Sequence, residues 1–386
     1  MPAPKPAPHF FDLDPDSLSA HFADWGLPAF RAKQVMQWVY QHGVADPQAM
    51  TNLAQRDRDL LSDRLRFRLG SPIRHESATD GTQKLLLQWP ADHADRADTD
   101  SPAATDPPPL AILGQSADDS IDAAAQTECV MIPAESKVSG RLRRTACISS
   151  QVGCPVGCKF CASGLGGLDA NLTAGQIVEQ VFQLQQIPGI ERITNIVFMG
   201  MGEPLANFNQ VVRALHTLMA DWAFNLAGRR ITVSTVGLPA QIRRLADLNL
   251  PITLAISLHA PNDDVRRKLI PWAERVTVDQ LIDAGRYYFD RTGREVTLEY
   301  ILLRHVNDRV EHARELADVA RRLRANINLI RYNEVAGLPF DRPTTDDVHQ
   351  FQHVLRERGV NTHIRASRGR DIAAACGQLR YEHQHS

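Results

Sequence analysis

The chain has 386 residues, of which 43% are hydrophobic, which is enough to bury the cores of two or three domains. No apolar run approaches the roughly 18 residues needed to span a bilayer, and residues 1–15 lack the apolar centre of a signal peptide. We therefore expect a cytoplasmic protein that has no membrane partner.

The formal net charge is −2, from 43 basic and 45 acidic residues, but the acidic residues are unevenly placed. Residues 91–125 carry eight Asp and one Arg, so the rest of the chain has 42 basic and 37 acidic residues, a net charge of +5. Basic clusters in that remainder could form a face for nucleic-acid phosphates, although solvated helix ends and salt bridges explain each cluster equally well. The clusters are Arg141, Arg143 and Arg144; Arg229 and Arg230; Arg266, Arg267 and Lys268; and Arg365, Arg368 and Arg370.

The N-terminal part of the chain reads as a small helical unit. Residues 27–69 carry apolar residues at helical spacing that is broken at Gly43 and Pro47. A short alternating stretch at 83–89 then predicts a strand. We expect residues 1–90 to form a helical accessory domain.

An unusual segment follows. Residues 91–125 are rich in Ala, Asp, Pro and Ser and cannot bury enough apolar area to order themselves, so they predict a flexible acidic insertion. The chain resumes at 128–133 with a strand that we expect to pair with the strand before the insertion. Residues 126–386 would then form the catalytic domain.

From residue 144 onward, six short apolar runs alternate with helical patterns. The nearly continuous apolar runs are typical of parallel strands covered on both faces, and amphipathic stretches at 174–186 and 310–323 are typical of crossover helices. The pattern predicts an α/β fold, a partial barrel of six β/α units. The predicted strands are 145–150, 193–200, 231–237, 252–260, 296–303 and 326–333.

Three cysteines, Cys154, Cys158 and Cys161, follow the first of these strands at a CxxxCxxC spacing with no fourth cysteine close behind them. Iron–sulfur clusters are held by cysteine thiolates, and a missing protein ligand leaves one iron open to a substrate such as S-adenosylmethionine. The alternative is a zinc knuckle with Cys147 as its fourth ligand, but zinc-binding CxxC pairs are normally separated by a longer loop.

Further polar motifs fall at the ends of the other predicted strands. In β/α barrels the loops that follow the strands carry the chemistry. The residues are Gly202 and Glu203 of MGMGEPL at 199–205, then Ser234, then Ser257, Leu258 and His259, and finally Asn333.

Four motifs together closely resemble the RlmN family: CISSQVGCPVGCKFC at 147–161, MGMGEPL at 199–205, AISLHAPND at 255–263 and SRGRDIAAACGQL at 367–379. These are radical S-adenosylmethionine enzymes that methylate C2 of an adenosine in 23S ribosomal RNA and in some transfer RNAs. The resemblance implies a radical SAM barrel with a small helical N-terminal domain, and both RNAs as substrates. The sister Cfr group, which methylates C8 of the same ribosomal adenosine, shares most of these motifs and is the alternative.

The resemblance also implies roles for single residues. Cys376 would accept a methyl group, Glu128 would remove a proton from the RNA, and Cys147 would resolve the covalent intermediate. Cys154, Cys158 and Cys161 would hold one [4Fe-4S] cluster. Two S-adenosylmethionine molecules would be used per methyl transfer, with an electron donor such as flavodoxin, and the cofactor would contact Gly202, Glu203, Ser234, Ser257, Leu258, His259 and Asn333.

Two other interpretations remain at this stage. Cys129 matches no role in the family, so we expect it to be a small hydrophobic core residue. A non-catalytic RNA-binding protein with a structural zinc is the alternative from a different functional class.

Overall fold

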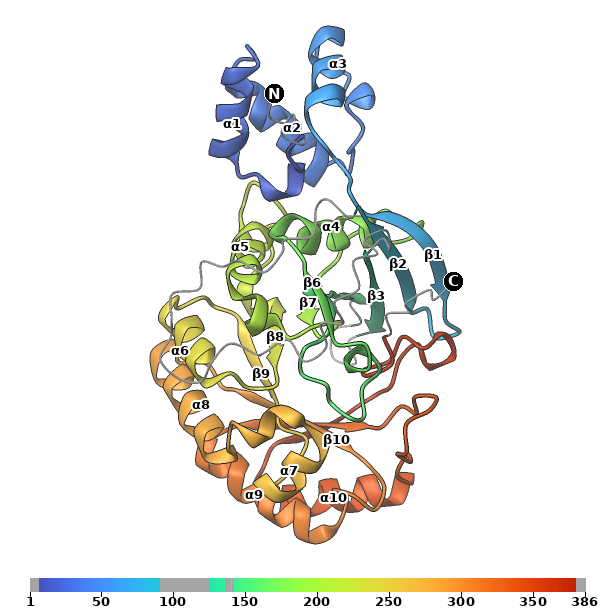
Figure 1. The fold of residues 1–386 in the computed structure, drawn as a ribbon, viewed down its shortest axis with the longest axis vertical. Coiled ribbons are helices and arrows are strands. Elements are labelled where there is room, and N and C mark those ends of the chain that lie inside the picture. The colour runs from blue at the N-terminus through green and yellow to red at the C-terminus, as the bar shows by residue number, and fades with distance from the viewer. Residues whose placement is uncertain (1–6, 91–124, 136–139, 141, 380–386) are drawn as a thin grey trace.

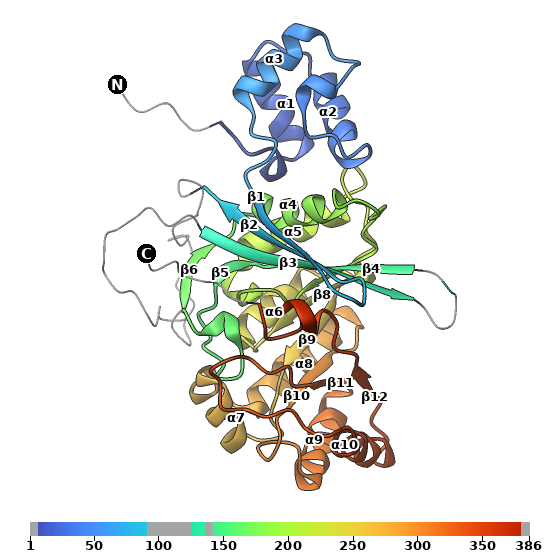
Figure 2. The same cartoon turned by 90° about the vertical axis from the view of Figure 1, so that its right-hand side faces the viewer.

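The computed structural model describes residues 7–90, 125–135, 140 and 142–379. Ten strands form one sheet in the order β1-β2-β3-β4-β7-β8-β9-β10-β11-β12 (Figures 1 and 2). Strands β4 and β7 to β12 run parallel, and β1 to β4 pair antiparallel. The strands of this sheet are β1 (Ser71–Ser77), β2 (Gln83–Trp89), β3 (Ala125–Glu135), β4 (Leu142–Cys147), β7 (Asn195–Phe198), β8 (Ile231–Thr235), β9 (Thr253–Ser257), β10 (Thr297–Leu302), β11 (Asn326–Arg331) and β12 (Thr362–Arg365), and a separate hairpin pairs β5 (Gln151–Gly153) with β6 (Leu168–Asn171).

Helices connect the parallel strands and cover their outer face, as Figure 1 shows for α6, α8, α9 and α10. The helices are α1 (Pro15–Asp24), α2 (Phe30–Tyr40), α3 (Gln55–Arg64), α4 (Ala174–Gln185), α5 (Phe208–Met219), α6 (Pro239–Asp247), α7 (Asp263–Leu269), α8 (Val278–Thr292), α9 (Val310–Leu323) and α10 (Thr345–Glu357). The predicted helices at 174–186 and 310–323 are therefore confirmed as α4 and α9. No helix in the described part of the chain is long and apolar enough to cross a membrane.

The predicted partial β/α barrel is confirmed, and all six predicted parallel strands are present as β4, β7, β8, β9, β10 and β11. The sheet also contains a seventh parallel strand, β12, which the sequence did not predict. Only four residues long, β12 contains a histidine and an arginine, so it lacks the apolar run that marks the other strands. The sheet order ends at β12 on one side and at β1 on the other.

A small helical region is present at the N-terminus, as the fold prediction expected, but the last part of the expected 1–90 unit belongs to the main sheet, since it forms β1 and β2. Helix α1 starts at Pro15, and the Asp14 side chain caps it by accepting from the Ser17 amide at 2.7 Å. Helices α1 to α3 stand together beyond one end of the sheet (Figure 2).

The strand before the predicted insertion pairs with the strand after it, as expected. Strands β2 and β3 are antiparallel, with Gln83 opposite Met131 and Trp89 opposite Ala125. Ala125 is therefore the first residue of β3 rather than the last of the insertion. Residues 91–124 lie outside the described residues.

Candidate active site

The three motif cysteines lie in the loop after β5. Gly153 sets the path of this loop, because its φ is +74° and a Cβ there would lie 2.1 Å from the carbonyl oxygen of Gly167. The Cys154 amide donates to that same carbonyl at 2.6 Å, and the Cys161 amide donates to the Cys158 carbonyl at 3.1 Å. The three residues are free cysteines of intermediate burial.

These cysteines line a cavity of about 150 Å³ at the carboxyl ends of the parallel strands. We call it the cysteine-loop cavity. Of the other residues predicted for the site, it is lined by Gly202, Glu203, Ser234, Ser257, His259 and Cys376, and it is also lined by Phe160, Glu299, Ile301, Ile330 and Arg365.

The Glu203 carboxylate is buried at the edge of this cavity. It accepts hydrogen bonds from the amides of Leu205 at 3.0 Å and Val236 at 2.7 Å, which tie the loop after β7 to the end of β8. Burial raises the pKa of Glu203 to about 7, although the bond from Val236 acts in the opposite direction. An ammonium group entering the cavity would give this carboxylate a strong partner.

The glycines of MGMGEPL are explained by packing. A Cβ on Gly200 would lie 2.7 Å from the carbonyl oxygen of Ile148, and a Cβ on Gly202 would lie 2.6 Å from Cβ of Gln151. Gly202 also has a φ of +99°. These two glycines let the loop after β7 pack directly against the chain that follows β4, which places Glu203 beside the cysteine loop.

The residues at the ends of β8 and β9 meet in the same cavity. The hydroxyls of Ser234 and Ser257 are 3.2 Å apart. His259 has a φ of +57°, its Nδ1 accepts from the Ile301 amide at 3.1 Å, and its ring lies edge-on to Phe160 at 5.1 Å between ring centres. Burial and the nearby Arg266 lower the pKa of His259 to about 3, so the ring is neutral and carries its proton on Nε2.

Two residues predicted for cofactor contact do not line this cavity. Leu258 is 1% exposed within the hydrophobic core, and its carbonyl accepts from Arg266 Nε at 3.3 Å. Asn333 lies beside the neighbouring cavity, where its Nδ2 donates to the Cys376 carbonyl at 3.4 Å.

A second cavity, of about 70 Å³, is lined by both Cys147 and Cys376. Cys376 lines the cysteine-loop cavity as well, so its thiol stands at the junction of the two. Burial and the neighbouring Cys376 raise the pKa of the Cys147 thiol to about 12, and Arg365 acts in the opposite direction. At neutral pH Cys147 is therefore a protonated thiol.

Two arginines from the predicted basic clusters are not on a surface face. Arg266 is fully buried and donates to the carbonyls of Leu258, Val276 and Val236. Arg365 lines both cavities and pairs with Glu299 at 3.3 Å. For these two residues the second of the two alternatives holds, because each guanidinium pairs with acceptors inside the protein.

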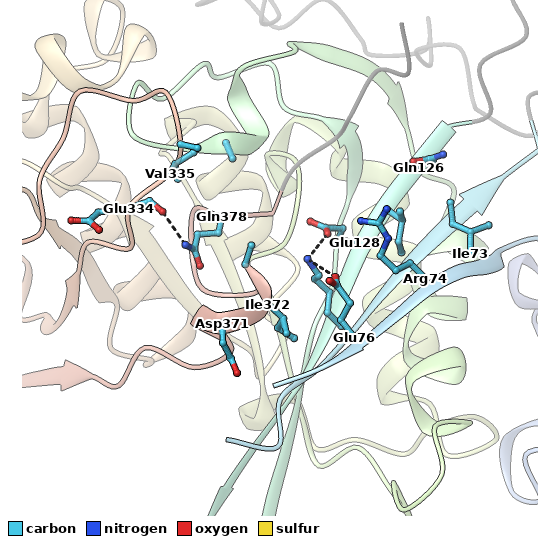
Figure 3. A pocket seen from close by; sticks show the side chains of 15 residues that line it. Ile73, Arg74, Glu76, Gln126, Glu128, Glu334, Val335, Asp371, Ile372 and Gln378 are labelled. Carbon is cyan, nitrogen blue, oxygen red and sulfur yellow. Dashed lines mark hydrogen bonds and ion pairs between the residues drawn. The ribbon is translucent and has the colours of Figure 1, made fainter. Parts of the chain in front are cut away.

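Glu128 lies in β3 beside a third and larger cavity, of about 620 Å³ (Figure 3). Its carboxylate pairs with Lys84 Nζ at 2.9 Å. The Glu128 backbone is held by the loops of the site, since its carbonyl accepts from Ser149 Oγ at 2.6 Å and its amide donates to Met201 Sδ at 3.5 Å. We call this cavity the β3 cavity.

Cys129, the next residue in β3, is fully buried in the main hydrophobic core. Its neighbour Val130 packs with Cys147 in a separate cluster. Because side chains alternate along a strand, Cys129 faces away from Cys147, as expected for a core residue.

The cysteine loop suits an iron–sulfur cluster. Burial raises the pKa of Cys154 to about 12 and also raises the pKa values of Cys158 and Cys161. These thiols would therefore lose their protons and become thiolates when a cationic metal centre binds. Within the described residues, no three His, Cys, Asp or Glu side chains are grouped to hold a single metal ion. In a four-iron cluster each cysteine binds a different iron, and Cys147, the fourth ligand of the zinc alternative, lines the second cavity instead.

The fold and the cysteine loop define a radical SAM protein, and comparisons with known proteins agree. The family model described as "Radical SAM superfamily" matches residues 148–317, and the one described as "Ribosomal RNA large subunit methyltransferase N-terminal domain" matches residues 9–66. The crystal structure of a radical SAM methyltransferase from Sphaerobacter thermophilus is 39% identical, with a TM-score of 0.83, and the match covers 96% of this chain and 99% of that one.

Curated relatives give the narrower assignment. The chain is 38% identical to the probable dual-specificity RNA methyltransferase RlmN of Rhodopirellula baltica, over 96% of this chain and 90% of that protein. It is also 38% identical to the dual-specificity RNA methyltransferase RlmN of Dichelobacter nodosus, over 96% of this chain and 93% of that protein. The chain belongs to the RlmN family of radical SAM RNA methyltransferases. Its cofactors are those of the superfamily, a [4Fe-4S] cluster and S-adenosylmethionine.

Proposed function

We propose that this protein methylates C2 of an adenosine in 23S ribosomal RNA and in transfer RNA, through a methylated Cys376. The observation that carries the proposal is the position of the Cys376 thiol, which lines both the cysteine-loop cavity and the cavity of Cys147. A methyl group on this sulfur would lie between the radical-generating site and the thiol that releases the product. The names of the two RlmN relatives, dual-specificity RNA methyltransferases, support two RNA substrates.

The cofactors would occupy the cysteine-loop cavity. Cys154, Cys158 and Cys161 would ligate the cluster, and the buried Glu203 carboxylate would take the amino group of S-adenosylmethionine. Ser234, Ser257 and the neutral His259 would supply further hydrogen bonds from neighbouring strand ends, and Leu258 and Asn333 would act from outside the cavity lining. When bound and reduced by a donor such as flavodoxin, these cofactors supply a 5'-deoxyadenosyl radical.

C2 of adenine explains why a protein thiol takes part. This carbon lies between two ring nitrogens and is electron-poor, so it does not attack the methyl group of a sulfonium as an ordinary nucleophile would. A carbon radical can add to it. Cys376 would first accept a methyl group from one S-adenosylmethionine, and hydrogen abstraction with a second molecule would leave a methylene radical on the Cys376 sulfur that adds to C2.

Two further residues would release the product. Glu128 would take the proton from C2 of the radical adduct, and the one unpaired electron that the methylene radical brought would leave to an oxidised acceptor such as the iron–sulfur cluster. The Cys147 thiol would then lose its proton and attack the Cys376 sulfur as a thiolate, forming a disulfide and breaking the bond from that sulfur to the methylene carbon. The electron pair of the broken bond stays on the carbon, which takes up a proton to become the methyl group, and a cellular reductant reopens the disulfide.

Mass spectrometry of digested nucleosides tests the reaction. Ribosomal and transfer RNA would each be treated with anaerobically reconstituted protein and methyl-labelled S-adenosylmethionine. We expect labelled 2-methyladenosine in both RNA fractions. Labelled 8-methyladenosine would assign the chain to the reaction of the Cfr group, and label in only one fraction would remove the other RNA from the proposal.

Cysteine variants test the intermediate. Cys376→Ala should abolish methylcysteine and all turnover, and Cys147→Ala should trap RNA on the protein as a covalent adduct, visible as a shifted band on a denaturing gel. Cys129→Ala is the matched control, because Cys129 is buried in the main core away from both cavities, and it should retain turnover. Normal methylated RNA from either Cys376→Ala or Cys147→Ala would contradict the mechanism.

A further inference from the structure

Three charged side chains form a row beside the β3 cavity. Lys84 of β2 lies between Glu76 of β1 and Glu128 of β3, and its Nζ is 3.0 Å from the Glu76 carboxylate and 2.9 Å from the Glu128 carboxylate. The side chains of Lys84 and Glu128 are only 8% and 10% exposed. Figure 3 shows the carboxylates of Glu76 and Glu128 on the side of the cavity opposite Glu334 and Gln378, with the dashed lines of their two ion pairs meeting between them.

The strand register explains why these groups meet. Glu76 is directly opposite Lys84, Lys84 is directly opposite Val130, and Val130 is directly opposite Cys147. Glu128 lies two residues from Val130 and therefore shares its face of the sheet. One face of the antiparallel strands β1 to β4 thus carries Lys84, the proposed base Glu128 and the proposed resolving thiol of Cys147.

A lysine in such a position calls for a physical reason. Burying an ammonium group is unfavourable unless it is paired, and an ordinary ion pair needs only one carboxylate. Here two carboxylates share one ammonium, so the three groups carry a net charge of −1 in their ordinary ionised forms. When Glu128 takes up a proton, Lys84 keeps a carboxylate partner in Glu76.

We propose that Lys84 is a positioning residue for Glu128, whose carboxylate its ion pair holds directed toward the β3 cavity until that carboxylate takes the proton from C2 of the RNA adduct. The inference rests on the proposed function. In the step, the C2–H bond breaks and its proton moves to Glu128, while the ring keeps the electron pair of that bond and gives up the one unpaired electron left by radical addition to an oxidised acceptor such as the iron–sulfur cluster. Lys84 gives up no proton, and its ammonium then pairs with Glu76 alone as an ion.

The β3 cavity has the room and the chemistry for an adenine. Its volume of about 620 Å³ is within the range of small-molecule sites. It is lined by both charged and neutral polar side chains, including Arg74, Gln126 and Gln378, which can bond the edges of a base. Four carboxylates also line it, which favours a neutral base over a phosphate group at this position; they are Glu76, Glu128, Glu334 and Asp371.

The test uses the full-length reconstituted protein with methyl-labelled S-adenosylmethionine and a ribosomal RNA fragment that wild-type protein methylates. Lys84→Met removes the ammonium and should slow release of methylated RNA by roughly ten-fold or more, because a displaced general base loses part of its contribution. The covalent RNA adduct should accumulate, as it should in Glu128→Gln, while methylation of Cys376 continues at the wild-type rate. Lys84→Arg should restore release in part.

Gln83→Met is the matched control. Gln83 is the neighbouring residue of β2 and also bonds side chains of β1, but it lies on the other face of the strand and does not line the β3 cavity. This variant should release RNA at the wild-type rate.

The outcomes separate this inference from the proposed function. If wild-type protein forms no methylcysteine and no 2-methyladenosine, the proposed function fails and the role of Lys84 fails with it. If wild-type protein turns over while Lys84→Met releases RNA as fast as Gln83→Met, the role of Lys84 alone is overturned. A Lys84→Met protein that loses methylation of Cys376 along with release would show a general structural defect, which also overturns a role specific to Glu128.

Discussion

Arg365 shows how a single charge is used within this site. Its guanidinium is 3.3 Å from the carboxylate of Glu299, whose side chain is only 4% exposed, and Asn328 donates to the other carboxylate oxygen at 2.9 Å. The charges of the neighbouring Cys376 and of Glu299 raise the pKa of Arg365, so it is a permanent cation beside both thiols of the second cavity. The sequence around Arg365 did not indicate this pairing with Glu299, because the nearby arginines suggested a cluster on the surface.

The Arg365→Met variant should be less stable because it leaves Glu299 buried without this cation. Removing one partner of a buried pair typically costs about 3–5 kcal/mol, but the Arg365 side chain is 30% exposed and water screens the pair, so we expect a loss of about 1–2 kcal/mol. Urea unfolding of the protein without cofactors measures this free energy.

Two companion variants show whether the pair itself is responsible. Adding Glu299→Gln to Arg365→Met removes the uncompensated charge and should recover part of the loss. Arg291→Met breaks an exposed pair with Asp247 and should leave the urea midpoint nearly unchanged. Equal midpoints for Arg365→Met and Arg291→Met would show that Arg365 adds no stability through Glu299.

At the scale of elements, the site depends on close packing between the loop after β7 and the chain after β4. Gly200→Ala should destabilise the protein by about 1–3 kcal/mol, because the new methyl group would lie 2.7 Å from backbone atoms of Ile148, which cannot rotate away. The measurement is again the free energy of urea unfolding.

Gly166→Ala is the matched control for this substitution. Nothing lies within 4 Å of a Cβ at Gly166, and neither glycine has a positive φ, so the two variants differ mainly in the available space. Gly166→Ala should be neutral, or more stable by up to about 1 kcal/mol through its unfolded state. Equal stability of the two variants would mean that the packed loop gives way at no cost.

Elements were predictable from sequence where one local pattern determines them. The continuous apolar runs predicted the six inner strands, and the CxxxCxxC spacing predicted the cysteine loop, because its residues are neighbours in the chain. Strand β1 was not predicted because most of its residues are exposed, so it lacks an alternating apolar face. The pairing of Lys84 with Glu128 was not predictable either, because it depends on the register between two strands separated by residues 90–124.

At the scale of the whole molecule, a buried polar junction joins the N-terminal segment to α4 of the barrel. His9 Nε2 is 3.0 Å from the Glu179 carboxylate and its Nδ1 is 3.5 Å from Asp12. Glu179 also accepts from the amide of Leu69 at 3.1 Å, and Asp12 accepts from the amide of Gly175 at 2.6 Å. Both the entry to the helical unit and the exit from it are thereby bonded to α4.

This junction predicts that stability depends on pH through His9. Burial by itself lowers the pKa of His9, but the hydrogen bonds and charges of Asp12 and Glu179 outweigh it, so the pKa is raised above 6.5. A histidine whose pKa is raised by folding adds stability that is fully present below about pH 6.5 and is lost as the pH rises through its folded-state pKa.

His9→Asn should therefore cost about 2–3 kcal/mol at pH 6, as expected when a buried ion pair is broken, and clearly less at pH 9. Urea unfolding at both pH values measures the difference, with the exposed His216→Asn as the control that should show no such change. A cost for His9→Asn that is the same at pH 6 and pH 9 would mean that His9 is neutral in the folded protein and that hydrogen bonds without charge hold the helical unit to the barrel.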